Sequence, residues 1–198
     1  TQADNVVAIG NSAAYSLTTA SNNIAIGTNA MKVHTTGERN MAIGTNAMDD
    51  TDAGSTSLGS IDNIFIGHNA GGGTWTDAAS NQNIGIGTNV MNGALAGALN
   101  NVGFGNSALN AVTYGDSNTA LGYLAGNDLT TGHSNVLLGS SAGKLSKTGI
   151  YNIAIGTDAF DAEDGNASYA IAIGLNALGG TNHDDSDFNI AIGHNAVA

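Results

Sequence analysis

Residues 23–31 read Asn-Ile-Ala-Ile-Gly-Thr-Asn-Ala-Met, and residues 40–48 repeat them almost letter for letter as Asn-Met-Ala-Ile-Gly-Thr-Asn-Ala-Met. Aligned on the glycine, similar copies follow one another at intervals of 17 to 23 residues along the chain. The eleven aligned glycines are Gly10, Gly27, Gly44, Gly67, Gly87, Gly105, Gly122, Gly139, Gly156, Gly174 and Gly193. A repeat this short and this faithful is typical of a solenoid, in which each copy forms one coil and stacks on its neighbours.

Each copy is predicted to be a short β-strand; positions are counted from the repeat glycine, so that −1 precedes it directly. Positions −3 and −1 hold mostly Ile, Val or Leu, as in Ile24 and Ile26. Positions −3 and −1 are two residues apart, so their side chains share one face of the strand. β-Branched side chains suit such a pleated surface. Position −2 points to the opposite face and is apolar or Gly in every copy. A strand that is apolar on both faces is covered on both, so one face lines the coil and the other meets a partner chain.

Two assignments of these faces are open. The preferred one places positions −3 and −1 inside the coil, opposite a column of small residues at position +3 such as Ala30 and Ala47. Large and small side chains facing each other would fill a thin interior without voids. Position −2, as in Ala25, would then face neighbouring chains. In the reverse assignment, position −2 lies inside the coil.

The turn after each strand is predicted from its Gly and Asn residues. The repeat glycine ends the strand, where a positive φ or a close backbone approach is cheap only for Gly. Asn at position +2 lies in the following turn, because Asn tolerates left-handed conformations and bonds its own backbone. A second Asn at position −4 precedes most strands, and its stacked copies are expected to form amide ladders. The structural repeat residues are thus Ile26, Gly27, Asn29, Ile43, Gly44 and Asn46.

Composition excludes several classes of partner. The formal charge is −12, with only four Lys and Arg residues, which make no basic stripe for nucleic acid. Cys is absent, so neither disulfides nor thiolate metal sites contribute. No apolar run approaches the roughly 20 residues of a membrane span, so no membrane insertion by this segment is expected. The repeats fill residues 1–198 as a single domain, and because the chain starts at Thr1 without Met, we expect it to be an excerpt of a longer fibre.

Specificity in a uniform rod is expected where the repeat is interrupted, because insertions form loops that often bind ligands. Three insertions stand out, at residues 49–62, 71–82 and 179–188. Trp75 is the leading candidate, as an aromatic platform for a sugar or a protein; the alternative is that its ring folds back over its own coil. The receptor-binding candidates are Trp75, Asp77, His183, Asp184 and Asp185.

No motif assigns catalysis, a metal or a cofactor to the chain. A nucleophile elbow, a phosphate loop and a His-Glu-x-x-His motif are all missing from the sequence. The acidic stretches, such as residues 161–164, lack the spacing of an EF-hand, which favours solvated charge over bound Ca²⁺. Asp and Glu lie mostly in insertions, and no Glu lies on a predicted strand, which argues against the paired carboxylates of a glycosidase. The residues at position +1 are too irregular to match an ice lattice.

The repeats resemble the head repeats of trimeric autotransporter adhesins of the YadA type, whose signature reads roughly Asn-Ser-Val-Ala-Ile-Gly. Residues 118–126, which read Asn-Thr-Ala-Leu-Gly-Tyr-Leu-Ala-Gly, are also similar to repeats of phage tail-fibre proteins. The likeness covers essentially the whole chain, although the adhesin unit is shorter. It implies an all-β, left-handed parallel β-roll solenoid of about eleven coils that assembles as a homotrimer.

The same resemblance implies an extracellular, non-enzymatic fibre or adhesin head segment on a bacterial surface or a virion tail fibre. The loops between coils would attach it to a cell-surface glycan or protein receptor, and trimerisation would present each loop three times. The alternative is a phage tail-fibre shaft with a mainly structural role. A glycan-cleaving tailspike and an ice-binding solenoid are less favoured.

Overall fold

Every repeat contributes one three-residue strand in the computed structural model, which describes residues 3–51, 59–76, 78–161, 167–180 and 187–197. The strands are β1 (Val7–Ile9), β2 (Ile24–Ile26), β3 (Met41–Ile43), β4 (Ile64–Ile66), β5 (Ile84–Ile86), β6 (Val102–Phe104), β7 (Thr119–Leu121), β8 (Val136–Leu138), β9 (Ile153–Ile155), β10 (Ile171–Ile173) and β11 (Ile190–Ile192). All eleven lie in one sheet in chain order, and each neighbouring pair is parallel. The predicted all-β solenoid is confirmed, with about ten turns.

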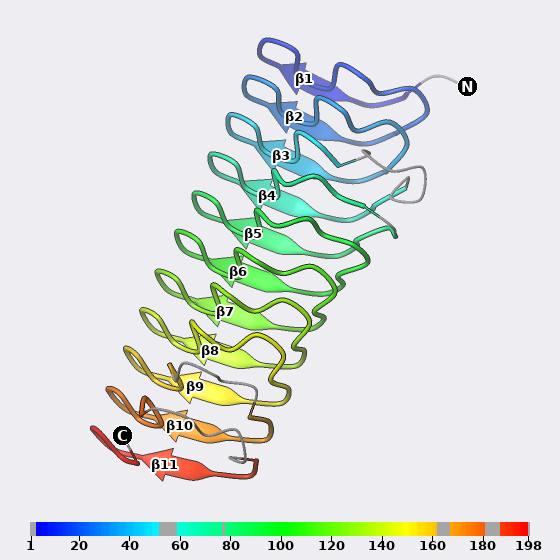
Figure 1. Cartoon of the computed structure of the whole chain (residues 1–198). Helices are drawn as coiled ribbons and strands as arrows, with labels where there is room; N and C mark the ends of the chain where they lie inside the picture. The colour runs from blue at the N-terminus through cyan, green and yellow to red at the C-terminus, as the bar shows by residue number, and fades with distance from the viewer. Residues whose placement is uncertain (1–2, 52–58, 77, 162–166, 181–186, 198) are drawn as a thin grey trace.

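The sheet keeps one register along the whole rod. Ala25 lies opposite Ala42, and Ala42 lies opposite Phe65, although 17 residues separate the first pair and 23 the second. Insertions therefore leave the strands and their pairing unchanged. In Figure 1 the strands stack from β1 to β11 across the long axis of the rod, and the two termini lie at its opposite ends.

Position −2 is the column of the sheet that points into the coil. Ala25 and Phe65 at this position are fully buried in the single chain, whereas Ile9 and Ile192 at position −1 are 58% and 67% exposed. The preferred prediction, with the Ile columns inside the coil, was therefore wrong, and the reverse assignment holds. The interior is thin, so the small side chains of position −2 fit it and two columns of Ile do not. The small residues of position +3 line the interior as predicted.

Large and small residues compensate one another inside the coils. Phe65 replaces the usual Ala of position −2, and a Cβ on Gly85 or Gly71 would lie 2.6 Å or 2.9 Å from atoms of its ring. Leu137 also replaces Ala, and a Cβ on Gly143 would lie 2.7 Å from its Cδ2. Each bulky residue is thus matched by a missing side chain in the same or an adjacent coil, as close packing requires.

Residues with positive φ form the turn after each strand. Gly27 and Gly44 have φ values of 134° and 137°, and Asn29 and Asn46 have values of 59° and 56°. The predicted turn roles of these residues are confirmed. Position +4 also has a positive φ, although it holds large residues such as Met31, whose side chain is fully buried. Packing in the core thus holds Met in a backbone conformation that it rarely adopts.

A ladder of buried Asn side chains runs along the interior at position −4. Asn118 shows the pattern: its Nδ2 donates to Asn101 Oδ1 (3.0 Å) and to the carbonyl oxygen of Gly132 (2.9 Å). Its Oδ1 accepts from the backbone N–H (3.1 Å) and from Nδ2 (2.9 Å) of Asn135. The predicted amide ladder is confirmed, and it satisfies polar groups that lie far from water. It joins Asn23, Asn40, Asn63, Asn83, Asn101, Asn118, Asn135 and Asn152.

Candidate functional site

The outer face of the sheet, defined as positions −3 and −1 of all eleven strands, points away from the coil interior. It consists of Val7, Ile9, Ile24, Ile26, Met41, Ile43, Ile64, Ile66, Ile84, Ile86, Val102, Phe104, Thr119, Leu121, Val136, Leu138, Ile153, Ile155, Ile171, Ile173, Ile190 and Ile192. Thr119 is its only polar residue, and no strand carries a charge. Many of these side chains are substantially exposed in the single chain, as Leu121 is by 52%.

The outer face is long and continuous. Ten strand spacings of about 4.8 Å make it about 50 Å long, and two columns of side chains make it about 10 Å wide, so its footprint is about 500 Å². Apolar patches of several hundred Å² on the surface of a single chain commonly mark interaction sites. An extended binding surface, repeated at the strand spacing, is therefore the main candidate site of the described chain.

Trp75, the leading receptor candidate from the sequence, lies in the core. Its side chain is fully buried, its Nε1 donates to the carbonyl oxygen of Gly71 (3.0 Å), and its ring packs edge-on against Phe65 at 5.9 Å. The interpretation of Trp75 as an exposed platform was wrong, and the alternative, a ring folded over its own coil, holds. Gly71 and Gly85, which lie against the ring of Phe65, leave the volume that the two aromatic rings occupy.

The other receptor candidates fall outside the described ranges, so the structure does not place them. They are Asp77, His183, Asp184 and Asp185. Within the described ranges, no group of three His, Asp or Glu side chains gathers in a way that could hold a metal ion. The same ranges enclose no pocket and contain no helix that could cross a membrane.

Two carboxylates on the described surface are unusual because they are half-buried. One oxygen, Oδ1, of Asp49 and of Asp161 is buried without a hydrogen-bond donor. Burial raises the pKa of both carboxyl groups above the ordinary value for Asp. Both therefore hold their negative charge less readily than solvated carboxylates do.

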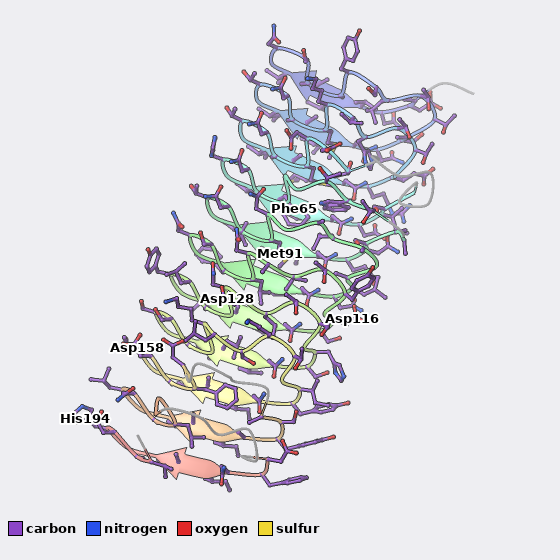
Figure 2. All side chains as sticks on the ribbon, viewed as in Figure 1. Phe65, Met91, Asp116, Asp128, Asp158 and His194 are labelled. Atoms are coloured by element: carbon purple, nitrogen blue, oxygen red, sulfur yellow. The ribbon has the colours of Figure 1, made fainter. Side chains whose placement is uncertain are left out.

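Two exposed columns flank the outer face. The entry column is position −5, where the chain enters each strand, and the exit column is position +1, just after the repeat glycine. Figure 2 shows Asp116, next to the entry column, and His194, in the exit column, on opposite edges of the rod. In the entry column, Arg39 donates two hydrogen bonds to the carboxylate of Asp62 (2.6 and 3.0 Å), which lowers the pKa of that carboxyl.

The entry column becomes aromatic in its last three coils. The rings of Tyr151 and Tyr169 stack with centroids 5.2 Å apart, and those of Tyr169 and Phe188 with centroids 4.9 Å apart. His133 packs edge-on against Tyr151 at 5.3 Å. We call Tyr151, Tyr169 and Phe188 the aromatic ladder. Sequence reasoning missed it, although a signal was present: all three aromatic residues occupy the same repeat position.

A scan against protein-family models and searches of curated proteins and of solved structures found no match to the chain. The outer face offers apolar contacts at one repeated spacing, and the edge columns add polar and aromatic contacts at the same spacing. Such an arrangement suits a partner with the same period along the rod.

Proposed function

We propose that the chain is a segment of an extracellular, non-enzymatic trimeric fibre that attaches to a cell surface. In this proposal three left-handed β-rolls pack through their outer faces, and the loops between coils contact the receptor. The observation that carries the proposal is the outer face, which is apolar along all eleven strands and, in the described part of the single chain, partly or largely exposed. Leaving such a surface in water is unfavourable, and burying it drives association.

A second copy of the chain suits the outer face better than an unrelated protein does. The face repeats its apolar rows at the strand spacing, and its register is unbroken from β1 to β11. A partner that fills every row must repeat at the same spacing, as another copy does. Because no strand carries a charge, the faces can meet without like-charge repulsion even though each chain has a formal charge of −12.

The outer face supplies part of the area that a stable assembly needs. Three outer faces of about 500 Å² each would together bury about 1,500 Å², or about 500 Å² at each of the three interfaces, so the edge columns would have to supply the rest of the roughly 1,000 Å² that a specific interface needs. The depletion of charge in the middle of the face is also typical of the core of an interface. Positions −3 and −1 would converge on the threefold axis, while position −2 would keep its place inside each coil.

The loops between coils are the proposed attachment sites. Repeat length varies from 17 to 23 residues without any change in strand register, so the rod tolerates loops of different length and composition. Loops held on a rigid scaffold are common binding elements. Threefold symmetry would present each loop three times, so weak contacts with a glycan or a protein receptor would add up.

The mass of the chain in solution tests the assembly. One chain has a mass of 19.6 kDa, so analytical ultracentrifugation should find three times this mass, 58.8 kDa. Leu121 is half-exposed on β7, so Leu121→Glu should leave the fold of a single chain intact. In the trimer it would bring three carboxylates together at the axis, and we expect the variant to sediment as a folded monomer.

The matched control is Thr131→Glu, which adds the same charge at an exposed position outside the outer face. We expect it to stay trimeric, with a circular dichroism spectrum like that of the wild type. A monomeric wild type would refute the trimer, and a Leu121→Glu variant that stays trimeric would refute the role of the outer face.

Attachment is tested with the labelled trimer on glycan arrays and on intact cells. We expect binding that weakens at least about tenfold in the Leu121→Glu monomer, because avidity is lost. Replacing each insertion in turn by the short turn of a 17-residue repeat, with Trp75 kept in the insertion at residues 71–82 because its ring fills the core, should identify the loop that makes the contact. Binding that survives all three replacements would contradict attachment through these loops.

One observation favours the second candidate, a fibre shaft with a mainly structural role. The side chain that the sequence ranks first for receptor contact, Trp75, is fully buried and stabilises the core. A shaft of this kind would set the distance between a fibre base and a receptor-binding tip. A stable trimer that binds neither glycans nor cells would support the shaft over the attachment segment.

A further inference from the structure

Exposed apolar side chains lie on both edges of the outer face at the level of β10. Tyr169, the middle ring of the aromatic ladder, is 45% exposed in the entry column, and Leu175 is 48% exposed in the exit column. Six residues separate the two positions across an extended strand, a distance of about 20 Å. They lie on opposite edges of the rod, as Asp116 and His194 do in Figure 2, so they cannot contact each other within one chain. Among the described residues, neither side chain is covered, so a second chain can reach both.

The spacing of the aromatic ladder restricts what can cover it. Its ring centroids follow one another at 5.2 Å and 4.9 Å, close to the distance between adjacent strands. Because stacking covers the faces of the middle ring, its edge is the part that remains available to a partner. A partner that touches all three rings must present its own groups at the same interval along the rod. The exit column of a second copy does so.

We propose that the aromatic ladder of each copy packs against Thr157, Leu175 and His194 in the exit column of the next copy, forming the seam between neighbouring chains. This inference rests on the trimer of the proposed function. In a parallel cyclic assembly, the same rotation about the threefold axis, which runs along the rods, relates each copy to the next. The entry edge of one copy therefore adjoins the exit edge of the next. Leu175, the only aliphatic residue of the exit column, then meets the middle ring of the ladder.

The same pairing suits coils outside the ladder. In the coil of β4 it brings Asp62 of the entry column next to His68 of the exit column, a carboxylate next to an imidazole. In the coil of β7 it brings the small Ser117 next to the large, exposed Tyr123. An antiparallel assembly would instead place entry columns against entry columns and exit columns against exit columns, so the aromatic ladder would not meet Leu175. The two edges are therefore complementary in the parallel arrangement at the coils of β4 and β7 and at the aromatic ladder.

Cysteine crosslinking tests the seam directly, because the natural chain has no Cys. The variant Tyr169→Cys/Leu175→Cys is treated with a thiol-specific crosslinker about 10 Å long, too short for the roughly 20 Å between the two positions in one chain. We expect most of the protein to run as a covalent trimer on a denaturing gel, since each copy links to the next around the ring. Ser117→Cys/Tyr123→Cys is a second pair of the same kind, so the test does not depend on the aromatic ladder itself.

Two controls fix the interpretation. Tyr169→Cys/Thr45→Cys also carries one Cys on each edge, but seven coils, or about 34 Å, separate them along the rod, so at least tenfold less crosslinking is expected. The single variant Tyr169→Cys should give no crosslinked product, because entry columns do not meet one another.

The possible outcomes distinguish a failure of the seam from a failure of the trimer on which it rests. If the protein sediments as a trimer but neither Cys pair gives a crosslinked product, the seam is refuted and the fibre proposal stands. Crosslinking of the single variant Tyr169→Cys would overturn the parallel arrangement. A covalent dimer as the final product would support the seam and refute threefold symmetry. A monomeric wild type would remove the trimer and the seam together.

Discussion

Replacing Asn118 by Ala removes one rung from the middle of the buried Asn ladder. The carbonyl oxygen of Gly132 loses its hydrogen bond from Asn118 Nδ2 (2.9 Å), and the backbone N–H of Asn135 loses its acceptor (3.1 Å). The other partners keep a bond: Asn135 Nδ2 still donates to Gly149, and Asn101 Oδ1 still accepts from the backbone N–H of residue 118. Two buried backbone groups are thus left without partners.

The expected loss follows from these two groups. A buried polar group without a partner costs about 1–3 kcal/mol, so Asn118→Ala should lower the free energy of unfolding by about 2–6 kcal/mol. The smaller Ala side chain also leaves a gap in the interior, so the upper part of this range is the more reasonable expectation.

Asn118→Asp keeps the shape of the side chain and changes its chemistry. The oxygen that replaces Nδ2 faces two acceptors, the carbonyl oxygen of Gly132 and Oδ1 of Asn101. The charged form is therefore disfavoured, and the folded-state pKa of the introduced carboxyl lies above its unfolded value of about 3.9. A group whose pKa is raised on folding destabilises the fold as the pH rises through that folded-state pKa. The variant should thus be closest to the wild type below about pH 4 and lose stability toward neutral pH.

Urea unfolding followed by far-UV circular dichroism, at fixed protein concentration and at pH 4 and pH 7.5, measures both effects. Asn100→Asp is the matched control: it lies in the adjacent coil, is exposed, and has a φ of 59° that Asp tolerates. We expect its stability to stay within about 0.5 kcal/mol of the wild type at both pH values. The reasoning fails if Asn118→Ala costs less than about 1 kcal/mol, or if the two Asp variants share one pH profile.

Three further predictions concern other parts of the rod. Gly156→Ala would place a Cβ 2.5 Å from the carbonyl oxygen of the next repeat glycine at a φ of 134°, and it should cost more than about 2 kcal/mol in urea unfolding. Gly193→Ala has a similar φ of 128° and open space around its Cβ, so equal losses would contradict the close backbone approach. Trp75→Ala should lower stability by about 3–5 kcal/mol, and the fluorescence of this single Trp should resist acrylamide quenching; free quenching in the wild type would contradict its burial. Because burial raises the pKa of Asp49, the penalty for its carboxylate grows as the pH rises through the folded-state value. Asp49→Asn should therefore stabilise the chain by less than about 1 kcal/mol at pH 7 and have no effect at pH 3, and a gain of equal size at both pH values would argue against this cause.

The strand positions, the register and the turn residues could be predicted because each depends on a local, repeated pattern. Gly and Asn are among the few residue types that adopt a positive φ readily, as Gly27 and Asn29 do. The alternation of side chains along a strand determines which residues share a face. The direction of the faces was predicted wrongly because both are apolar. The sizes of the side chains could have indicated the direction: the large Phe65 and Leu137 at position −2 coincide with glycines at nearby positions, as in a packed interior.

The candidate site could be predicted less well than the fold. Trp75 follows three glycines and reads as a loop residue, yet it lies eight residues after its repeat glycine, as Leu95 does, and both are buried. The aromatic ladder was missed because stacking between residues 18 or 19 positions apart becomes visible only once the coil length is known. Periodic features of the surface therefore need the register before they can be recognised.

The hydrogen bonds between neighbouring coils run along the long axis of the rod, because the strands lie across it. A pull along this axis loads every junction in the direction in which its bonds break, and each junction of a lone chain carries the full tension. Chains that lie side by side divide that tension at every level. The tensile strength of such a fibre would therefore depend on how many chains run in parallel and would not increase with the number of coils.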